Sequence, residues 1–150
     1  SVAHWPEPLT LVVVGDGSHR PFVERAAEEA GVAHRVTFLG AVGDDELPAL
    51  YQNALAVVYV PFDEDYGLVT LEGFLAAKPV VTASDSGGTL EFVADGVTGR
   101  VTAPDPRAVG EAIAELHGAR HVAAAFGAAG RERAAAITWD QVIDRLVSHG

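Results

Sequence analysis

The sequence predicts an α/β domain in which helices cover both faces of an open parallel sheet. Short apolar runs rich in β-branched residues recur along the chain, as in strands buried on both faces of a parallel sheet. Segments with helical spacing of apolar residues separate these runs. Strands that alternate with helices in this way are typical of a Rossmann-like, doubly wound fold with three α/β/α layers. The length suits one domain, so residues 1–150 are treated as a single unit.

The first half of the chain is expected to contain three strands and two helices. A lead-in over residues 1–8 shows no period, and strands are predicted at residues 10–15, 35–40 and 55–61. The first and third of these runs are continuously apolar and should be buried on both faces. Helices are predicted at residues 20–30, with Phe22 and Val23 among the apolar positions, and at residues 44–53, with Asp44 as the candidate N-cap.

The second half is expected to contain two strands and several helices. A helix from about residue 67 to residue 77 precedes a strand at 79–84, and a short helix follows the glycine pair at 87–88. A fifth strand is predicted at 99–102 and an amphipathic helix at 106–117. The C-terminal helices, residues 119–150, comprise an alanine-rich helix at 119–136, which Gly127 and Gly130 interrupt, and a last helix at 140–148.

The composition excludes several classes of function. A net charge of −11 without a basic run argues against nucleic-acid binding, so no nucleic-acid partner is expected. The chain lacks cysteine, and its six histidines show no ligand spacing, so no metal site is expected. No apolar run approaches the roughly 20 residues of a membrane span. We therefore expect a cytoplasmic protein, or one bound peripherally at the inner face of the membrane.

Four polar loops each follow a predicted strand. They lie at residues 15–17, 40–42, 62–67 and 84–88. Because the carboxyl ends of parallel strands meet at one edge of a sheet, these loops should line the crevice in which such sheets bind ligands.

Two glutamates flank the glycine that opens the third predicted helix. Glu64 falls in the loop before Gly67, and Glu72 lies on the first turns of the helix. The free N–H groups and the positive dipole end at Gly67 suit an anion such as a phosphate, whereas carboxylates accept hydrogen bonds from sugar hydroxyls. A nucleotide sugar, which is anionic in the middle and hydroxylated at the ends, fits this arrangement.

Two interpretations of the glutamate pair stay open. The two carboxylates are either solvated surface acids or ligands for such a molecule. The apolar neighbours of Glu72 favour the second interpretation, because they should partly enclose this carboxylate and require a partner for it. A glycosidase pair is disfavoured, since both acids lie in one loop–helix segment and not across a cleft.

Two glycine turns are ambiguous as well. The turn with Gly15 and Gly17 is half of a dinucleotide fingerprint, but Arg20 stands where the third glycine belongs. It is either a tight turn that needs positive φ or a place where Gly17 lets a ligand approach the backbone. The glycine pair at 87–88 before Glu91 forms either the start of a short helix or a loop that closes over the ligand.

Several motifs follow one another in a specific order and spacing. They are the strand and glycine turn at 11–17, the strand at 36–40, Glu64-x7-Glu72 with Gly67-Leu68, Lys78-Pro-Val-Val81, Gly87-Gly88-x-x-Glu91 and Asp95-Gly-x-x-Gly99. In this series the chain resembles, over nearly its whole length, the C-terminal, nucleotide-sugar-binding half of the GT-B fold. The family that the chain resembles is family 4 of the retaining glycosyltransferases, which is also called glycosyl transferases group 1.

The resemblance implies a role for each matching residue at the helix start. Glu64 would hold hydroxyls of the donor sugar, and Glu72 would bind the ribose hydroxyls. The backbone N–H groups near Gly67, Leu68 and Val69 would face the diphosphate.

The resemblance also implies what lies around the base. Gly15 and Gly17 would line the diphosphate or base region, and the backbone at Val42 would contact the base. Members of the family generally need no metal, so the resemblance implies no cofactor and a nucleoside-diphosphate sugar as the donor substrate.

The chain departs from the family pattern at several points. The family's diphosphate-clamping Arg and Lys precede the opening strand, whereas here only residues 1–8 do so, and Lys78 is the sole lysine. The family's N-terminal domain, which binds the acceptor, is absent from residues 1–150. Ala77 replaces the usual glycine at the helix end, which strains the turn if it needs a left-handed conformation. Because the chain has no methionine, Ser1 is expected to follow a processing or cloning boundary.

The expected function is therefore that of a donor-binding domain. We expect a retaining glycosyltransferase that moves a sugar from a nucleoside-diphosphate sugar to an acceptor that the sequence does not identify. The isolated chain is expected to bind nucleotide weakly and to be inactive. The alternatives are a non-catalytic GT-B-like binding or interaction module and a flavodoxin-like regulatory domain. The latter is disfavoured because Lys78 precedes the fourth strand.

Overall fold

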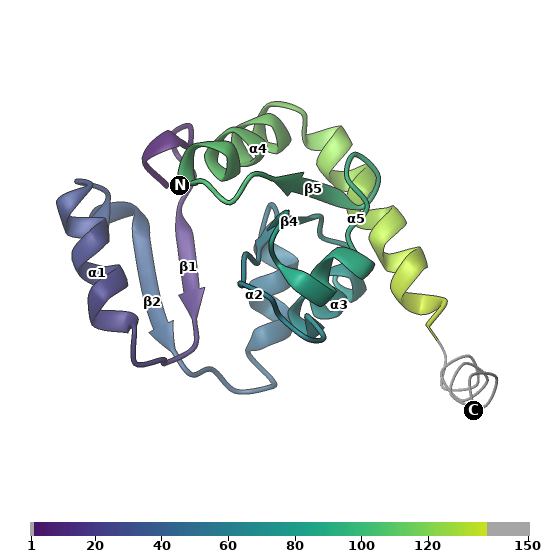
Figure 1. Cartoon of the computed structure of the whole chain (residues 1–150), viewed down its shortest axis with the longest axis horizontal. Helices are drawn as coiled ribbons and strands as arrows, with labels where there is room; N and C mark the ends of the chain where they lie inside the picture. Colours follow the sequence, from purple (N-terminus) through teal and green to yellow (C-terminus); the bar gives the residue numbers. More distant parts are fainter. Residues whose placement is uncertain (1, 138–150) are drawn as a thin grey trace.

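In the part of the chain that the structure describes, the fold is α/β and all five strands are in parallel pairs (Figure 1). The structure is a computed structural model and describes residues 2–137. Strands β1 (Leu11–Val14) and β2 (Val36–Gly40) form one sheet, and β3 (Val57–Val58), β4 (Val80–Ala83) and β5 (Gly99–Thr102) form a second in the order β3-β4-β5. The predicted parallel α/β class is confirmed. The strands form two hydrogen-bonded groups where the sequence pattern suggested one sheet.

Five α-helices connect and cover these strands in the described part of the chain. They are α1 (Arg20–Glu29), α2 (Leu47–Asn53), α3 (Leu68–Leu75), α4 (Pro106–Gly118) and α5 (Arg120–Ala135). Short 3-10 turns occur as η1 (Val2–His4), η2 (Ala33–Arg35) and η3 (Gly87–Glu91). The helix predicted at 140–148, and with it part of the C-terminal helices at 119–150, lies outside the described residues.

The start of α2 differs from the prediction. Glu46 occupies the N-cap position and makes no side-chain cap, so the prediction that Asp44 caps this helix is wrong. Pro48 lies in the first turn, where its fixed φ and missing N–H cost nothing. The proline, and not the acid, marks where the helix begins.

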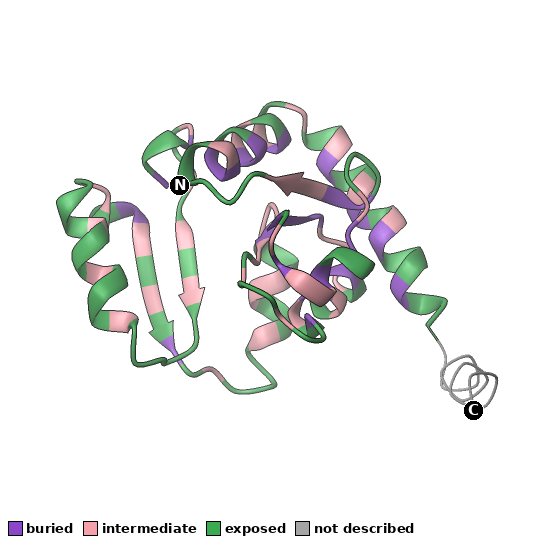
Figure 2. Cartoon of the chain, viewed as in Figure 1, coloured by how far each residue is buried: buried purple, intermediate pink, exposed green. Residues whose placement is uncertain are grey.

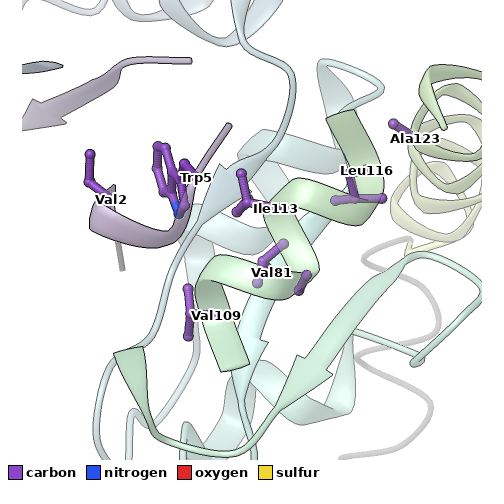
Figure 3. Close-up of a cluster of buried hydrophobic side chains, with 8 residues drawn as sticks. Val2, Trp5, Val81, Val109, Ile113, Leu116 and Ala123 are labelled. Atoms are coloured by element: carbon purple, nitrogen blue, oxygen red, sulfur yellow. The ribbon is translucent and has the colours of Figure 1, made fainter. Parts of the chain in front are cut away.

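The main hydrophobic core lies between β4 and α4 (Figure 3). The apolar face of α4 contributes buried side chains that pack with Val81 of β4 and with Val2 and Trp5 of the N-terminal lead-in. Asp105 caps α4 by accepting a hydrogen bond of 2.8 Å from the backbone N–H of Arg107. A cap of this kind typically contributes about 1 kcal/mol to helix stability.

Arg35 fixes the lead-in to the first sheet. Its buried guanidinium donates to the carbonyl oxygen of Leu9 at 2.7 and 3.0 Å and to that of Trp5 at 3.3 Å. It also forms an ion pair of 3.2 Å with Glu7. The segment before β1, which shows no period in the sequence, is therefore ordered by one side chain that arrives from η2.

The first sheet is more open than predicted (Figure 2). Half-buried and exposed positions alternate along β1, and Val12 and Val14 are 44% and 41% exposed. Helix α1 has no buried residue, and Phe22 is 69% exposed. The prediction that β1 is buried on both faces is wrong, because no described element covers the Val12 and Val14 face. Every residue of β4, by contrast, is buried.

Helix α5 approaches α3 closely through two glycines. A Cβ on Gly130 would lie 2.8 Å from Cε1 of Phe74, and a Cβ on Gly127 would lie 2.6 Å from the carbonyl carbon of Ala77. Phe74 itself is fully buried in the second core cluster, with Val80 and Val93. The two glycines that interrupt the alanine-rich helix are thus its contact surface, and they pack against the C-terminal end of α3.

Candidate functional site

The loop between β3 and α3 is held against the turn that follows β4. The backbone N–H of Asp63 donates to the carbonyl of Asp85 at 3.0 Å, and that of Gly88 donates to the carbonyl of Glu64 at 2.6 Å. A Cβ on Gly87 would lie 2.6 Å from both the backbone N and O of Glu64. The glycine pair at 87–88 is therefore required for the loop that carries Glu64 to pack on this turn.

Gly67 ends this loop and opens α3. It occupies the left-handed region with φ 62° and ψ 42°, and a Cβ there would lie 2.7 Å from Oγ1 of Thr89. Among residues 2–137 no side chain caps α3, which leaves the N–H groups of Leu68 and Val69 available at the positive end of the helix. This combination of a bare glycine and uncapped N–H groups can receive an anion.

Glu64 lies half-buried in the same loop. The hydroxyl of Tyr59, which directly follows β3, donates to its Oε2 at 3.1 Å. Burial, together with the hydrogen bond to the carboxylate, raises the pKa of Tyr59 above its ordinary value. The carboxylate is therefore oriented by a neutral hydroxyl.

Glu72 is exposed, which corrects the prediction that its apolar neighbours enclose it. Leu68 and Leu75 on α3 are themselves exposed, because the buried face of this helix is the one with Thr70, Gly73 and Phe74. Glu72 nevertheless has a partner, as the hydroxyl of Tyr51 on α2 donates to its Oε2 at 2.7 Å. Burial first, and then the carboxylate, raise the pKa of Tyr51 well above its ordinary value.

A cavity of about 390 Å³ lies beside Glu72, between α2 and α3. Its lining comprises Asp44, Leu47, Pro48, Tyr51, Gln52, Glu72, Leu75 and Ala76. Asp44 stands two residues after Val42, the residue predicted to contact the base. The cavity therefore extends from Glu72, which is predicted to bind the ribose, to the segment that follows Val42, which is predicted to contact the base.

The glycine turn after β1 lies apart from this segment. Gly15 has φ 112° and donates its N–H to the carbonyl of Gly40 at 2.7 Å, so glycine is required there by the backbone. Gly17 does not have a positive φ, and no described residue comes within 4 Å of a Cβ built there. No hydrogen bond or ion pair within residues 2–137 joins this turn to residues 61–72. The fold gives no packing reason for glycine at Gly17.

The charge around Glu64 is negative. Asp63, Asp65, Asp85 and Glu91 lie in the loop and in the turn packed on it, and none of them forms an ion pair within residues 2–137. No group of three metal-ligating side chains converges in the described part of the chain. Within the same residues, no helix is both long enough and apolar enough to cross a membrane.

Comparison with known proteins decides the family. A family model described as glycosyl transferases group 1 matches residues 5–133. The chain belongs to this family. The resemblance drawn from the motif series is confirmed at this level.

Two relatives of this family member are longer than the chain. A GDP-mannose-dependent alpha-(1-6)-phosphatidylinositol monomannoside mannosyltransferase of Mycobacterium tuberculosis is 41% identical over 159 residues, covering 97% of this chain and 40% of the relative. A human alpha-1,3/1,6-mannosyltransferase is 32% identical, covering 81% of this chain and 29% of the relative. The chain thus spans well under half the length of these proteins.

Solved structures show the same fold. The Anabaena protein HepE in complex with UDP and glucose superimposes with a TM-score of 0.84 at 27% identity, over 99% of this chain and 43% of that one. WaaG, a glycosyltransferase involved in lipopolysaccharide biosynthesis, gives a TM-score of 0.79 at 26% identity, over 97% and 40%. These are GT-B glycosyltransferases, so the predicted Rossmann-like half of a GT-B fold is confirmed.

Two features of the site could not be found from the sequence. Tyr51 and Tyr59 precede their carboxylates by 21 and 5 residues, respectively, and neither spacing follows a motif. The only available signal was the expectation that the Glu72 carboxylate should have a partner.

Proposed function

We propose that the chain is the donor-binding domain of a retaining, family 4 glycosyltransferase that uses a nucleoside-diphosphate sugar. One observation supports this most directly. Along the chain, Glu64 precedes and Glu72 follows the uncapped helix start at Gly67, and a tyrosine hydroxyl orients each carboxylate. Hydroxyl acceptors on both sides of an anion-binding helix terminus match the chemistry of a nucleotide sugar.

In this proposal each part of the ligand has its own ligating groups. Glu64 accepts hydroxyls of the donor sugar, and Glu72 accepts those of the ribose. The N–H groups of Gly67, Leu68 and Val69 receive the diphosphate. Gly15, Gly17 and Val42 lie against the diphosphate and the base.

The reaction needs more than this chain supplies. When the sugar leaves, negative charge grows on the diphosphate, and the positive end of α3 stabilises it without a metal. The acids around Glu64 repel the negative charge of the diphosphate. Within residues 2–137 no Arg or Lys forms an ion pair with these acids. We propose that an N-terminal GT-B domain completes the basic clamp and binds the acceptor. The isolated chain then binds nucleotide weakly and transfers nothing.

The donor is proposed from the relatives. The mycobacterial relative, at 41% identity, is GDP-mannose-dependent by name, whereas the structural neighbour HepE binds UDP at 27% identity. The higher identity favours guanosine diphosphate and mannose. The proposed location is the cytoplasm or the inner face of the membrane.

The experiment is a titration of the chain with GDP, UDP and ADP, repeated with Glu72→Ala. We expect GDP to bind best, with millimolar affinity, and Glu72→Ala to weaken binding about tenfold through loss of charge-assisted hydrogen bonds. Glu132→Ala is the matched control, because Glu132 is an exposed acid on α5. Absence of binding at millimolar nucleotide, or an unchanged affinity in Glu72→Ala, contradicts the donor-site assignment.

The second candidate is a non-catalytic GT-B-like binding or interaction module. The negative charge around Glu64 favours it, since the nearby acids form no ion pair within residues 2–137. Joining the chain to an N-terminal GT-B domain separates the two candidates. Hydrolysis or transfer of the donor sugar by the joined protein supports the transferase, and binding without turnover supports the module.

A further inference from the structure

Each of the two carboxylates is held by one tyrosine. Tyr51 donates to Oε2 of Glu72 at 2.7 Å, and Tyr59 donates to Oε2 of Glu64 at 3.1 Å. The tyrosines come from different elements, α2 and the end of β3, yet they make the same contact. The chain has three tyrosines, and the third, Tyr66, is 73% exposed and makes no hydrogen bond within residues 2–137.

We propose that Tyr51 and Tyr59 are positioning residues, which hold Glu72 and Glu64 so that the remaining carboxylate oxygen faces the ligand. The inference rests on the proposed function and adds to it the residues that prepare the donor site. Tyr51 then acts on the ribose side of the ligand, and Tyr59 acts on the sugar side.

The hydrogen-bonding capacity of the hydroxyl and carboxylate groups supports a role in which one carboxylate oxygen meets the tyrosine and the other meets the ligand. A tyrosine hydroxyl donates one hydrogen bond, whereas a carboxylate accepts through two oxygens. In both pairs Oε2 is occupied, and Oε1 has no partner within residues 2–137. One oxygen of each carboxylate is therefore fixed, and the other is available to a ligand hydroxyl.

The tyrosine rings give the contacts a rigid origin. Both rings pack against the second core cluster, which contains the buried side chains of Phe74 and Val80. The backbone N–H of Tyr59 also donates to the carbonyl of Val81 at 3.0 Å, which ties this residue to β4. An exposed glutamate alone samples several rotamers, and a ligand that immobilises it must offset that entropy. Bonding to a packed ring removes part of this cost before the ligand arrives.

The hydroxyls of Tyr51 and Tyr59 remain protonated donors at neutral pH. Burial and the neighbouring carboxylates raise the pKa of both tyrosines above the ordinary value of 10.0. A protonated phenol beside a carboxylate can only donate to it, so the direction of both hydrogen bonds is fixed at neutral pH.

A purely structural role makes a different prediction. If the hydroxyls only satisfied their own hydrogen bonding, removing them would change stability but not the preference for particular ligand groups. The contribution of the ribose hydroxyls and that of the sugar are therefore the quantities to measure.

The experiment measures affinities for three forms of the nucleotide that binds best in the titration above. They are the diphosphate, its 2′,3′-dideoxy form and its sugar ester. The ratio of dideoxy to parent dissociation constants reports the ribose contribution, and the ratio of diphosphate to sugar ester reports the sugar contribution. Tyr51→Phe, Tyr59→Phe and Tyr66→Phe each remove one hydroxyl and keep the ring, and circular dichroism verifies their folding.

We expect Tyr51→Phe to lower the ribose ratio about three- to tenfold and to leave the sugar ratio unchanged, because only the charge-assisted bond to Glu72 is lost. Tyr59→Phe should lower the sugar ratio and leave the ribose ratio unchanged, and Tyr66→Phe should change neither ratio. Unchanged ratios in Tyr51→Phe and Tyr59→Phe, with Glu72→Ala still lowering the ribose ratio, overturn the inference and leave the proposed function intact. Failure of the parent chain to bind, or a Glu72→Ala variant like the parent, contradicts the proposed function, and the inference falls with it.

Discussion

Ala77 is held in a conformation that suits glycine. It follows the last turn of α3 with φ 55°, and its N–H donates to the carbonyl of Phe74 at 2.8 Å. The N–H of Lys78 donates to the carbonyl of Gly73 at 2.9 Å, which completes a Schellman motif around Ala77. The left-handed conformation costs an L-residue roughly 1–2 kcal/mol. The strain expected from the sequence is therefore present at this turn.

Replacing Ala77 with glycine should stabilise the protein. The relief of strain exceeds the extra conformational entropy of glycine in the unfolded chain, so we expect a gain of about 0.5–1 kcal/mol. Urea unfolding followed by circular dichroism measures it as a higher midpoint at constant slope. Ala76→Gly is the matched control, because Ala76 has an ordinary φ of −80° and the change should destabilise. Equal effects of both variants would contradict the argument.

The residues of the site differ in how well the sequence could predict them. Glu64 and Glu72 could be chosen as candidates, because a glycine-opened helix after an apolar strand marks where acids can meet a ligand, and their role as ligands stays a prediction. The exposure of Glu72 could not be predicted, since the orientation of α3 depends on which of its apolar residues meet the core. Tyr51 and Tyr59 escaped the sequence for a related reason: their contacts depend on how α2 and the end of β3 pack near α3.

At the scale of elements, α5 determines how α3 is supported. The buried positions of α5 are all small, and they recur every three or four residues as Ala123, Gly127, Gly130 and Ala134. At two of these positions only glycine leaves enough room for the neighbouring group. Gly130 faces the ring of Phe74, and Gly127 faces the turn at Ala77. In the sequence these glycines are only interruptions of a helix. Their function becomes visible once the partner helix is known.

Gly130→Ala should destabilise the fold despite the higher helix propensity of alanine. Alanine gains about 1 kcal/mol in a helix interior, but overpacking against the fully buried Phe74 ring costs about 1–3 kcal/mol. We expect a net loss of up to about 2 kcal/mol in denaturant unfolding. Gly118→Ala serves as the control, since no atom of the described residues lies within 4 Å of a Cβ at that position. A Gly130→Ala variant at least as stable as the parent would show that α5 can move away from α3.

For the whole molecule, packing is uneven between the two sheets. Figure 2 shows buried positions concentrated around α4, β4 and α3, while α1 and the β1–β2 pair carry few. The N-terminal ends of β1 and β2 reach the main core through Leu11 and Val36, whereas Val14 at the far end of β1 is exposed. The strand-and-helix alternation predicts the element order correctly, because it depends on local periodicity. It does not predict this gradient, which depends on which elements cover each strand.

Amide hydrogen exchange followed by mass spectrometry should reproduce the gradient. We expect peptides from α1 and from the end of β1 to exchange fastest among the regular elements, and those from β4 and α4 slowest. Elements with few buried contacts open at low free-energy cost, and α1 has no buried residue, whereas α4 has five. Both helices are regular and longer than two turns, so α4 is a fair internal reference for α1. Equal protection of the two helices would contradict the gradient and indicate that the open face of the β1–β2 pair is covered in solution.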